Sequence, residues 1–174
     1  KPMESHELDR IYELPYTGEY HPTYKKDGGV PALREVKFSV VTHRGCYGSC
    51  AFCAIAQHQG KIIQSRSKES VINEVKKLTE FSDFKGVIHD VGGPTANMYK
   101  TGCDRDGEGH CGKRQCLHPG PCSNLNSTHA EYIDLLRSIR EIPGVNHVFI
   151  RSGIRYDLLM EDGDNDFLQE LCEH

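Results

Sequence analysis

The sequence predicts an α/β protein in which parallel strands alternate with helices. Three short apolar runs, residues 36–41, 86–91 and 147–152, are each followed by a segment whose apolar residues recur with a helical spacing. Strand–helix–strand units of this kind pair their strands in parallel through right-handed crossovers. The carboxyl ends of the three strands are therefore expected on one edge of the sheet, where the chemistry of such folds takes place.

The first helix is expected at residues 68–81, after the first strand. Ser67 precedes it as a capping residue. Val71, Val75 and Leu78 share one face, while charged residues occupy the others. This apolar face is expected to pack on the strands.

Two further helices follow the second and third strands. Thr128 and Glu131 form a capping-box pattern at the start of a helix expected at residues 130–141, and Pro143 lies just beyond its end. Asp166 is the expected cap of a third helix. Each helix returns the chain for the next parallel strand.

The repeats leave two segments outside regular structure. Residues 1–34 contain four prolines and a glycine pair without a sustained helical period, so an extended amino-terminal segment is expected, with a short turn at residues 8–14. Residues 35–174 form the core. Within it, residues 96–127 are a polar insertion with four cysteines, and connections of that length are usually functional or disordered.

Composition excludes several classes of protein. The net charge of −4 gives no footprint for non-specific nucleic-acid binding. No apolar run approaches the roughly 18 residues of a membrane span, so no membrane partner is expected. The eight cysteines stand at ligand-like spacings without an export signal, which favours metal chemistry in a reducing cytoplasm. Because the chain starts at Lys1, we expect a piece of a longer protein.

A CxxxCxxC triplet directly follows the first strand. Its three thiols are Cys46, Cys50 and Cys53, and Gly45 and Gly48 allow tight turns that direct backbone N–H groups towards cluster sulfurs. Thiolates are soft ligands that suit iron–sulfur clusters. Three thiolates leave one iron of a cubane cluster open, whereas structural zinc normally takes four protein ligands. The triplet therefore predicts a cluster with an open iron.

Two other interpretations of the triplet stay open. A zinc ion could take the cysteines together with a fourth ligand, His43 or His58. Cys50 and Cys53 alone could form a redox dithiol, although that function leaves Cys46 unused.

Five runs of the sequence together resemble the YgiQ-type branch of the radical S-adenosylmethionine (SAM) superfamily. They are residues 46–53, 64–67, 90–99, 121–126 and 152–157. The similarity covers most of the chain from Asp9 onward. It implies that the core, residues 35–174, is about the first half of a partial (β/α)6 radical SAM barrel, preceded by part of an amino-terminal extension.

The resemblance also implies a [4Fe–4S] cluster held by Cys46, Cys50 and Cys53, with SAM chelated at the open iron. In the superfamily, an electron from the reduced cluster cleaves SAM to methionine and a 5'-deoxyadenosyl radical, which abstracts hydrogen from the substrate. The implied partners are SAM, an electron donor such as a flavodoxin or ferredoxin, and a substrate that the sequence does not identify. No side chain is assigned a catalytic role.

Five residues are implied to bind SAM: Phe52, Gly92, Gly93, Ser152 and Arg155. In the superfamily, a Gly-Gly-Glu segment presents backbone to the SAM amino group, but here Pro94 replaces the acid. Ser152 and Arg155 could reach the ribose or carboxylate of SAM, or form strand-end hydrogen bonds instead. His89 and Asp90 point to opposite faces of their strand, so at most one of them faces the barrel interior.

A second group of thiols lies in the insertion. It comprises Cys103, Cys111, Cys116 and Cys122, with His110 and His118 interleaved. An auxiliary iron–sulfur cluster, a structural zinc and ordinary thiols remain the alternatives, because the spacings match no standard zinc pattern. Cys172 is expected to be an unligated thiol.

The chemistry of the cysteines admits two classes of function. The first is a radical SAM enzyme. The alternative is a non-catalytic zinc- or iron–sulfur-binding interaction module, or a simple electron carrier that ignores SAM.

Overall fold

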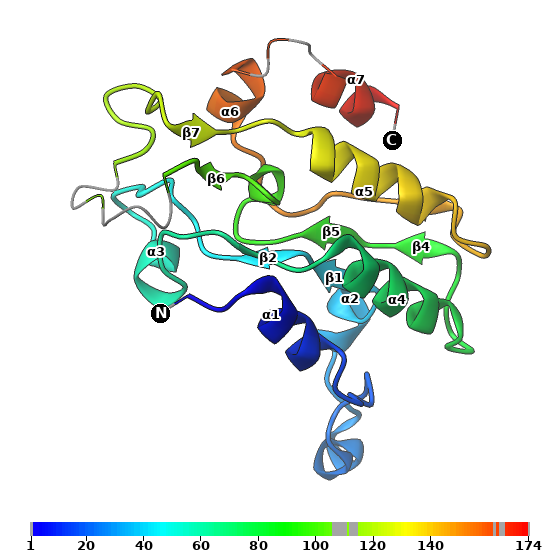
Figure 1. The fold of residues 1–174 in the computed structure, drawn as a ribbon. Helices are drawn as coiled ribbons and strands as arrows, with labels where there is room; N and C mark the ends of the chain where they lie inside the picture. The colour runs from blue at the N-terminus through cyan, green and yellow to red at the C-terminus, as the bar shows by residue number, and fades with distance from the viewer. Residues whose placement is uncertain (1, 106–110, 112–114, 162, 164–165, 174) are drawn as a thin grey trace.

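The computed structural model describes residues 2–105, 111, 115–161, 163 and 166–173. Helices and strands alternate along these residues (Figure 1). In chain order the elements are α1 (Ser5–Tyr12), η1 (Pro22–Asp27), α2 (Leu33–Val36), β1 (Ser39–Val41), β2 (His43–Arg44), α3 (Ile55–His58), β3 (Gln64–Ser65), α4 (Lys68–Thr79), β4 (Val87–Ile88), β5 (Asp90–Gly92), η2 (Ala96–Met98), β6 (Gly102–Cys103), β7 (Leu125–Asn126), α5 (Ala130–Arg140), β8 (His147–Val148), α6 (Tyr156–Glu161) and α7 (Asp166–Cys172).

The central strands pair in parallel, as the βαβ pattern predicts. Strand β1 pairs with β5 and places Val40 opposite Val91, and β4 pairs with β8 and places Ile88 opposite Val148. His89 alone separates β4 from β5, so one run of chain joins both pairs. The predicted α/β class is confirmed, and the described strands form an open half-fold rather than a closed barrel.

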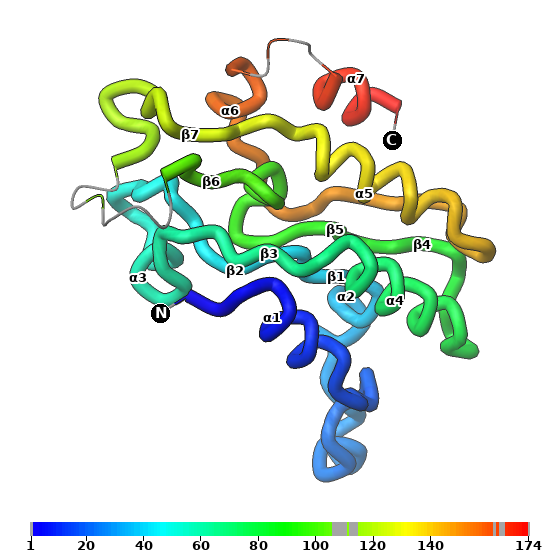
Figure 2. The backbone as a smooth tube through the Cα atoms, viewed as in Figure 1, coloured from blue at the N-terminus to red at the C-terminus, as the bar shows by residue number. Residues whose placement is uncertain are grey.

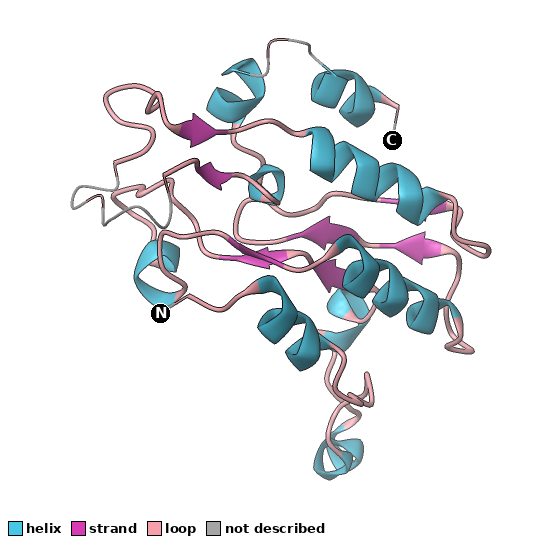
Figure 3. Ribbon diagram, in the orientation of Figure 1, coloured by secondary structure: helices cyan, strands magenta, loops and turns pink. Residues whose placement is uncertain are grey.

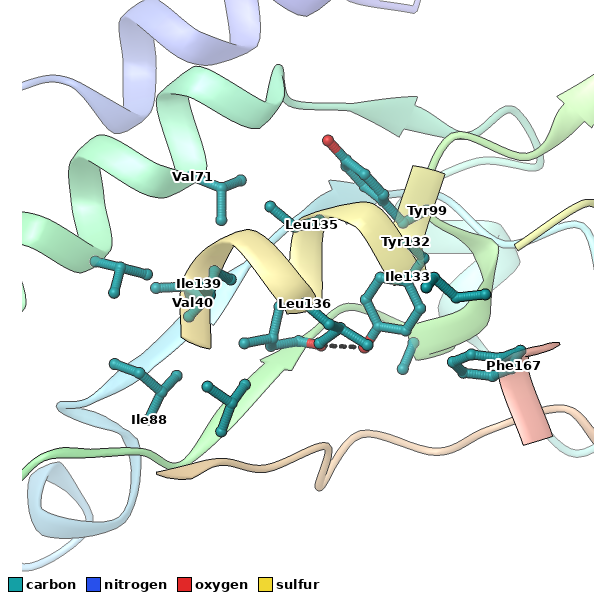
Figure 4. Close-up of a cluster of buried hydrophobic side chains, with 14 of the residues drawn as sticks. Val40, Val71, Ile88, Tyr99, Tyr132, Ile133, Leu135, Leu136, Ile139 and Phe167 are labelled. Atoms are coloured by element: carbon teal, nitrogen blue, oxygen red, sulfur yellow. Dashed lines mark hydrogen bonds between the residues drawn. The ribbon is translucent and has the colours of Figure 1, made fainter. Parts of the chain in front are cut away.

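Helices α4 and α5 lie side by side and cover one face of these strands (Figure 3). Their fully buried side chains interlock with those of the strands, as Figure 4 shows for Val71, Leu135 and Ile139 around Val40 and Ile88. Each such aliphatic side chain contributes about 1.5–3 kcal/mol through burial. Packing of amphipathic helices on a parallel sheet therefore holds the core.

The amino-terminal segment departs from the extended conformation expected of it. The expected turn at residues 8–14 is helix α1, which starts at a capping box formed by Glu4 and Glu7 and buries Leu8. The predicted strand 36–41 begins only at Ser39, because Val36 ends helix α2 and is exposed.

Polar contacts tie the amino-terminal segment to the core. The carboxylate of Asp9 accepts the N–H of Ser67 at 3.0 Å, at the start of α4. Lys37 Nζ binds Glu19 at 2.6 Å and Asp83 at 2.9 Å, so one ammonium group joins the segment to the loop after α4.

The insertion is anchored at its base. Strands β6 and β7 pair antiparallel, with Cys103 opposite Leu125, and both lie near the cysteine loop (Figure 2). The first residues of segment 96–127 belong to the core, since Ala96, Asn97 and Met98 are completely buried. No described helix has the length and apolar character needed to cross a membrane.

Candidate functional site

The cysteine triplet lies on the loop between β2 and α3. Gly45 opens the loop with φ +91°, and a Cβ there would lie 2.0 Å from the carbonyl oxygen of Ile62. Any other residue would combine an unfavourable backbone conformation with a backbone clash. Cys46 N–H donates to the Gly60 carbonyl at 3.0 Å, which ties the start of the loop to the segment after α3.

The buried side chain of Tyr47 anchors the cysteine loop to the core. Its ring is buried with Cys46, Met98 and Leu158, and its hydroxyl lies 2.9 Å from the Thr101 hydroxyl. Burial raises the pKa of Tyr47 to about 12, so the phenol stays protonated at neutral pH. The loop is thus anchored to the base of the insertion.

The three thiols differ in exposure. Cys46 is 9 % exposed, whereas Cys50 and Cys53 are half-buried and line an open hollow of about 400 Å³. All three are free thiols. Within the described ranges, no three His, Cys, Asp or Glu side chains already converge on one metal position. The donor set suits an iron–sulfur cluster, for which thiolates are the usual ligands.

Phe52 lies at the same hollow. Its side chain is 93 % exposed, the highest value among the large apolar residues that the structure describes. An aromatic ring held in solvent beside two thiols is available to cover a ligand.

Gly92 and Gly93 stand at the carboxyl end of β5, as predicted. A Cβ on Gly92 would lie 2.2 Å from Ser152 Oγ, and a Cβ on Gly93 would lie 2.6 Å from a ring carbon of His43. Packing therefore requires both glycines, because Ser152 and His43 occupy the space beside them.

His43 lies beneath Gly93 and is completely buried. Its Nδ1 lies 2.8 Å from the Thr42 hydroxyl, while Nε2 has no hydrogen-bond partner among the described residues. Burial lowers the pKa of His43 to about 4, so the ring is neutral at pH 7. His43 was considered above only as a zinc ligand, and it joins no group of three ligands in the described part of the chain.

Asp90 points towards the end of β8, whereas His89 packs edge-on against Phe38 on the other side of the strand. The Asp90 carboxylate accepts the N–H groups of Arg151 at 2.8 Å and Ser152 at 3.0 Å, and the Ser152 hydroxyl donates to it. Asp90 thus organises the loop on which Arg155 stands.

Arg155 connects that loop to the cysteine triplet. Its Nη1 donates to Cys50 Sγ at 3.2 Å, and its Nε donates to Asp157 at 2.9 Å, with Nη2 on the second oxygen of the same carboxylate. The hydrogen bonds that Arg155 donates to Asp157 hold the pKa of Arg155 above its ordinary value, and they lower the pKa of Asp157. Sequence reasoning placed Arg155 near SAM and missed Asp157, although both belong to the run 152–157.

The second cysteine group is only loosely gathered. Cys116 packs against the cluster of Tyr47 and Met98, and its carbonyl accepts the Cys122 N–H at 2.8 Å. Cys103 is half-buried in β6, and Cys111 and Cys122 are exposed. His110 lies outside the described residues, and those described do not form a three-ligand metal group. Cys172 is an exposed thiol on α7.

Comparison with known proteins gives one family match and a set of sequence relatives. The family model described as Radical SAM N-terminal matches residues 1–39. The match and the relatives below support a radical SAM amino-terminal fragment.

The relatives are proteins named UPF0313 protein. One from Clostridium botulinum (strain Okra / Type B1) is 53 % identical over 174 residues, which are 99 % of this chain and 27 % of the relative. One from Clostridium perfringens (strain ATCC 13124) is 52 % identical over 99 % of this chain and 26 % of the relative. The chain thus spans about a quarter of the length of these relatives.

Proposed function

We propose that this chain carries the cluster-binding part of a radical SAM enzyme. Cys46, Cys50 and Cys53 would hold a [4Fe–4S] cluster through three of its irons. The observation that carries the proposal is the position of three free thiols on one glycine-shaped loop, beside the carboxyl ends of parallel strands. Radical SAM family membership supports the same assignment.

When bound, the cluster and SAM supply the reductive cleavage that generates a 5'-deoxyadenosyl radical, the chemistry common to the superfamily. The chain's own residues position these groups and exclude water. Cys46 would provide the buried side of the cluster, while Cys50 and Cys53 face the hollow from which SAM would approach.

The SAM seat would lie between the hollow and the end of β5. Gly92 and Gly93 would contribute backbone atoms to this seat, and the exposed ring of Phe52 would cover the ligand. Ser152 lines the same strand end, although its hydroxyl already donates to Asp90. Because Pro94 lacks a carboxylate, recognition of the SAM amino group would depend on backbone carbonyls.

The remaining assignments follow from the same proposal. Residues 35–174 would be the incomplete radical SAM core and residues 1–34 the extension in front of it. A flavodoxin- or ferredoxin-type donor would supply the electron. The cysteine content would fit a reducing cytoplasm. The rest of the longer protein would select the substrate.

Electron paramagnetic resonance of the full-length protein tests the proposal. The protein would be reconstituted anaerobically and reduced with dithionite, and spectra recorded with and without SAM. We expect a reduced-cluster signal that changes when SAM is added. Cys50→Ala should abolish the signal, whereas Cys172→Ala, which removes an exposed thiol on α7, should leave it unchanged.

Two results would refute the proposal that the protein is a radical SAM enzyme. A colourless protein that retains zinc would establish the non-catalytic metal-binding module. A cluster signal indifferent to SAM in the full-length protein would establish an electron carrier.

A further inference from the structure

A chain of buried and partly buried polar contacts leads from the start of helix α5 to the cysteine loop. It ends where Arg155 Nη1 donates to Cys50 Sγ at 3.2 Å, a contact between residues 105 positions apart in sequence. A guanidinium hydrogen bond to a thiolate is charge-assisted and therefore stronger than a neutral one. Such a contact matters only if the guanidinium group is held in place.

Asn97 holds the backbone of Arg155 from both sides. Its Oδ1 accepts the Arg155 N–H at 2.9 Å, and its Nδ2 donates to the Arg155 carbonyl at 3.0 Å. Asn97 is completely buried in η2, and the neighbouring Ala96 N–H donates to the Gly153 carbonyl at 2.8 Å. The loop after β8 is thus fixed to the loop after β5.

His129 fixes the orientation of the Asn97 amide. Its Nε2 lies 3.1 Å from Asn97 Nδ2, and because an amide nitrogen can only donate, Nε2 must accept. The His129 ring is buried and stacks on Phe167 of α7, with ring centroids 4.6 Å apart and planes 14° apart. A reversed amide would set its nitrogen against the Arg155 N–H, donor against donor. By accepting from Asn97 Nδ2, the stacked His129 ring therefore secures the two hydrogen bonds between Asn97 and the Arg155 backbone, which we call the Asn97 clamp.

Asp157 and Gly48 fix the guanidinium group itself. Asp157 accepts from Nε and Nη2, which sets the plane of the group and leaves Nη1 directed at Cys50. A Cβ at Gly48 would lie 2.6 Å from Nη1, so the glycine provides the space that Arg155 occupies. The donor is therefore positioned independently of the sulfur, and a small closing movement of the loop would leave it within reach.

We infer that Arg155 is a positioning residue of the cluster: it donates to the Cys50 sulfur and raises the reduction potential, and Asn97 and His129 hold it there. The inference rests on the proposed cluster at Cys46, Cys50 and Cys53. Reduction adds negative charge to a cluster, so a cationic donor to a ligand sulfur stabilises the reduced form more than the oxidised form. Arg155 thereby commits three of its five N–H donors within the chain.

A redox titration of the full-length protein tests the inference, with the amplitude of the reduced-cluster signal measured against applied potential. Arg155→Ala should lower the equilibrium constant for cluster reduction about tenfold, which is a fall of about 59 mV in midpoint potential for a one-electron couple. Asn97→Ala removes no charge, yet should lower the potential in the same direction. Arg151→Ala is the matched control, because Arg151 is exposed on the same loop and, among the described residues, its side chain pairs only with Glu35, at 3.4 Å.

Arg155→Lys keeps the positive charge and guards against loss of folding in the alanine variant. A single ammonium group cannot bind Asp157 at two points as a guanidinium group does. The midpoint potential of the Arg155→Lys variant should therefore lie between those of the wild type and Arg155→Ala. A purely structural role would lower the melting temperature and leave the potential unchanged.

The possible failures are distinguishable. If the wild-type protein binds a cluster and both Arg155→Ala and Arg155→Lys have the wild-type midpoint potential, the inference is refuted and the proposed function stands. Loss of only the SAM-induced spectral change would assign Arg155 to SAM and refute the inference as well. A wild-type protein without any cluster would refute both.

Discussion

At Gly93 the packing leaves no room for a side chain. A Cβ would lie 2.6–2.9 Å from three atoms of the His43 ring, which is itself completely buried. Gly93→Ala should therefore destabilise the protein by about 1–3 kcal/mol, the usual cost of overpacking a rigid site. Chemical denaturation measures the loss. Gly102→Ala is the control, because a Cβ there meets nothing within 4 Å, and equal effects of the two substitutions would contradict the packing argument.

His43 predicts a pH dependence of stability. Its pKa is lowered to about 4 in the folded protein, against about 6.5 in the unfolded chain, so unfolding takes up a proton between these values. The stabilising contribution is fully present above pH 6.5 and is lost as the pH falls to about 4, to a limit of about 3 kcal/mol. His43→Gln should flatten the free energy of unfolding over this range, relative to wild type. Identical pH profiles would show that His43 titrates normally.

The sequence identifies some site residues by type and others not at all. Cysteines and paired glycines can be recognised as site candidates from the sequence, because few roles other than ligation or close packing require them at those spacings. Asn97 and His129 carry no such signal, since an amide and an imidazole occur in many surface settings. Only the fold brings them to Arg155, which is 58 positions from Asn97.

Helix α4 begins where a side-chain cap is present, and α5 begins without one. Ser67 Oγ accepts the Ser70 N–H at 3.1 Å, which confirms the predicted cap of α4. The predicted capping box at Thr128 and Glu131 is wrong: the cap of α5 is His129, and its side chain makes no capping hydrogen bond. The Thr128 hydroxyl accepts instead from the Ala130 N–H at 3.4 Å, a long hydrogen bond to the first residue of the helix.

Removing the two hydroxyls should therefore have unequal effects. Ser67→Ala is expected to cost about 1 kcal/mol, because the first turn of α4 loses a partner for one N–H group. Thr128→Ala is expected to cost less than about 0.5 kcal/mol, as is usual for a substitution outside such features. Thermal or chemical denaturation of both variants measures the difference. Equal losses would restore the capping box.

Long periodic segments were predicted better than short ones. Helices α4 and α5 were predicted to within two residues, because their apolar faces repeat over three turns. Helix α4 ends at Thr79 rather than residue 81, and α5 ends at Arg140 rather than residue 141. Helix α6 was not expected, and Asp166, expected to precede α7 as its cap, is its first residue. Two-residue strands such as β2 and β3 carry no periodicity, so only tertiary pairing reveals them.

The described part of the molecule is built from three βα units. Its strands form an open half-fold. The cysteine loop follows β1 and β2, Gly92 and Gly93 end β5, and Arg155 follows β8, so the carboxyl-end rule predicted which loops would meet. The rule does not predict which atoms touch. The contact between Arg155 and Cys50 depends on the clamp by Asn97, a detail of side-chain packing.

The outer edge of β8 provides a prediction for the longer protein. His147 and Phe149 direct their N–H groups to β4, at Gly86 and Ile88. Because N–H groups alternate along a strand, Val148 and Ile150 direct theirs to the opposite edge. The radical SAM core proposed above would place a further strand there. Amide hydrogen exchange of the full-length protein should show Val148 and Ile150 protected as strongly as Phe149. Rapid exchange at both, with Phe149 protected, would mean that β8 is an edge strand in the complete protein as well.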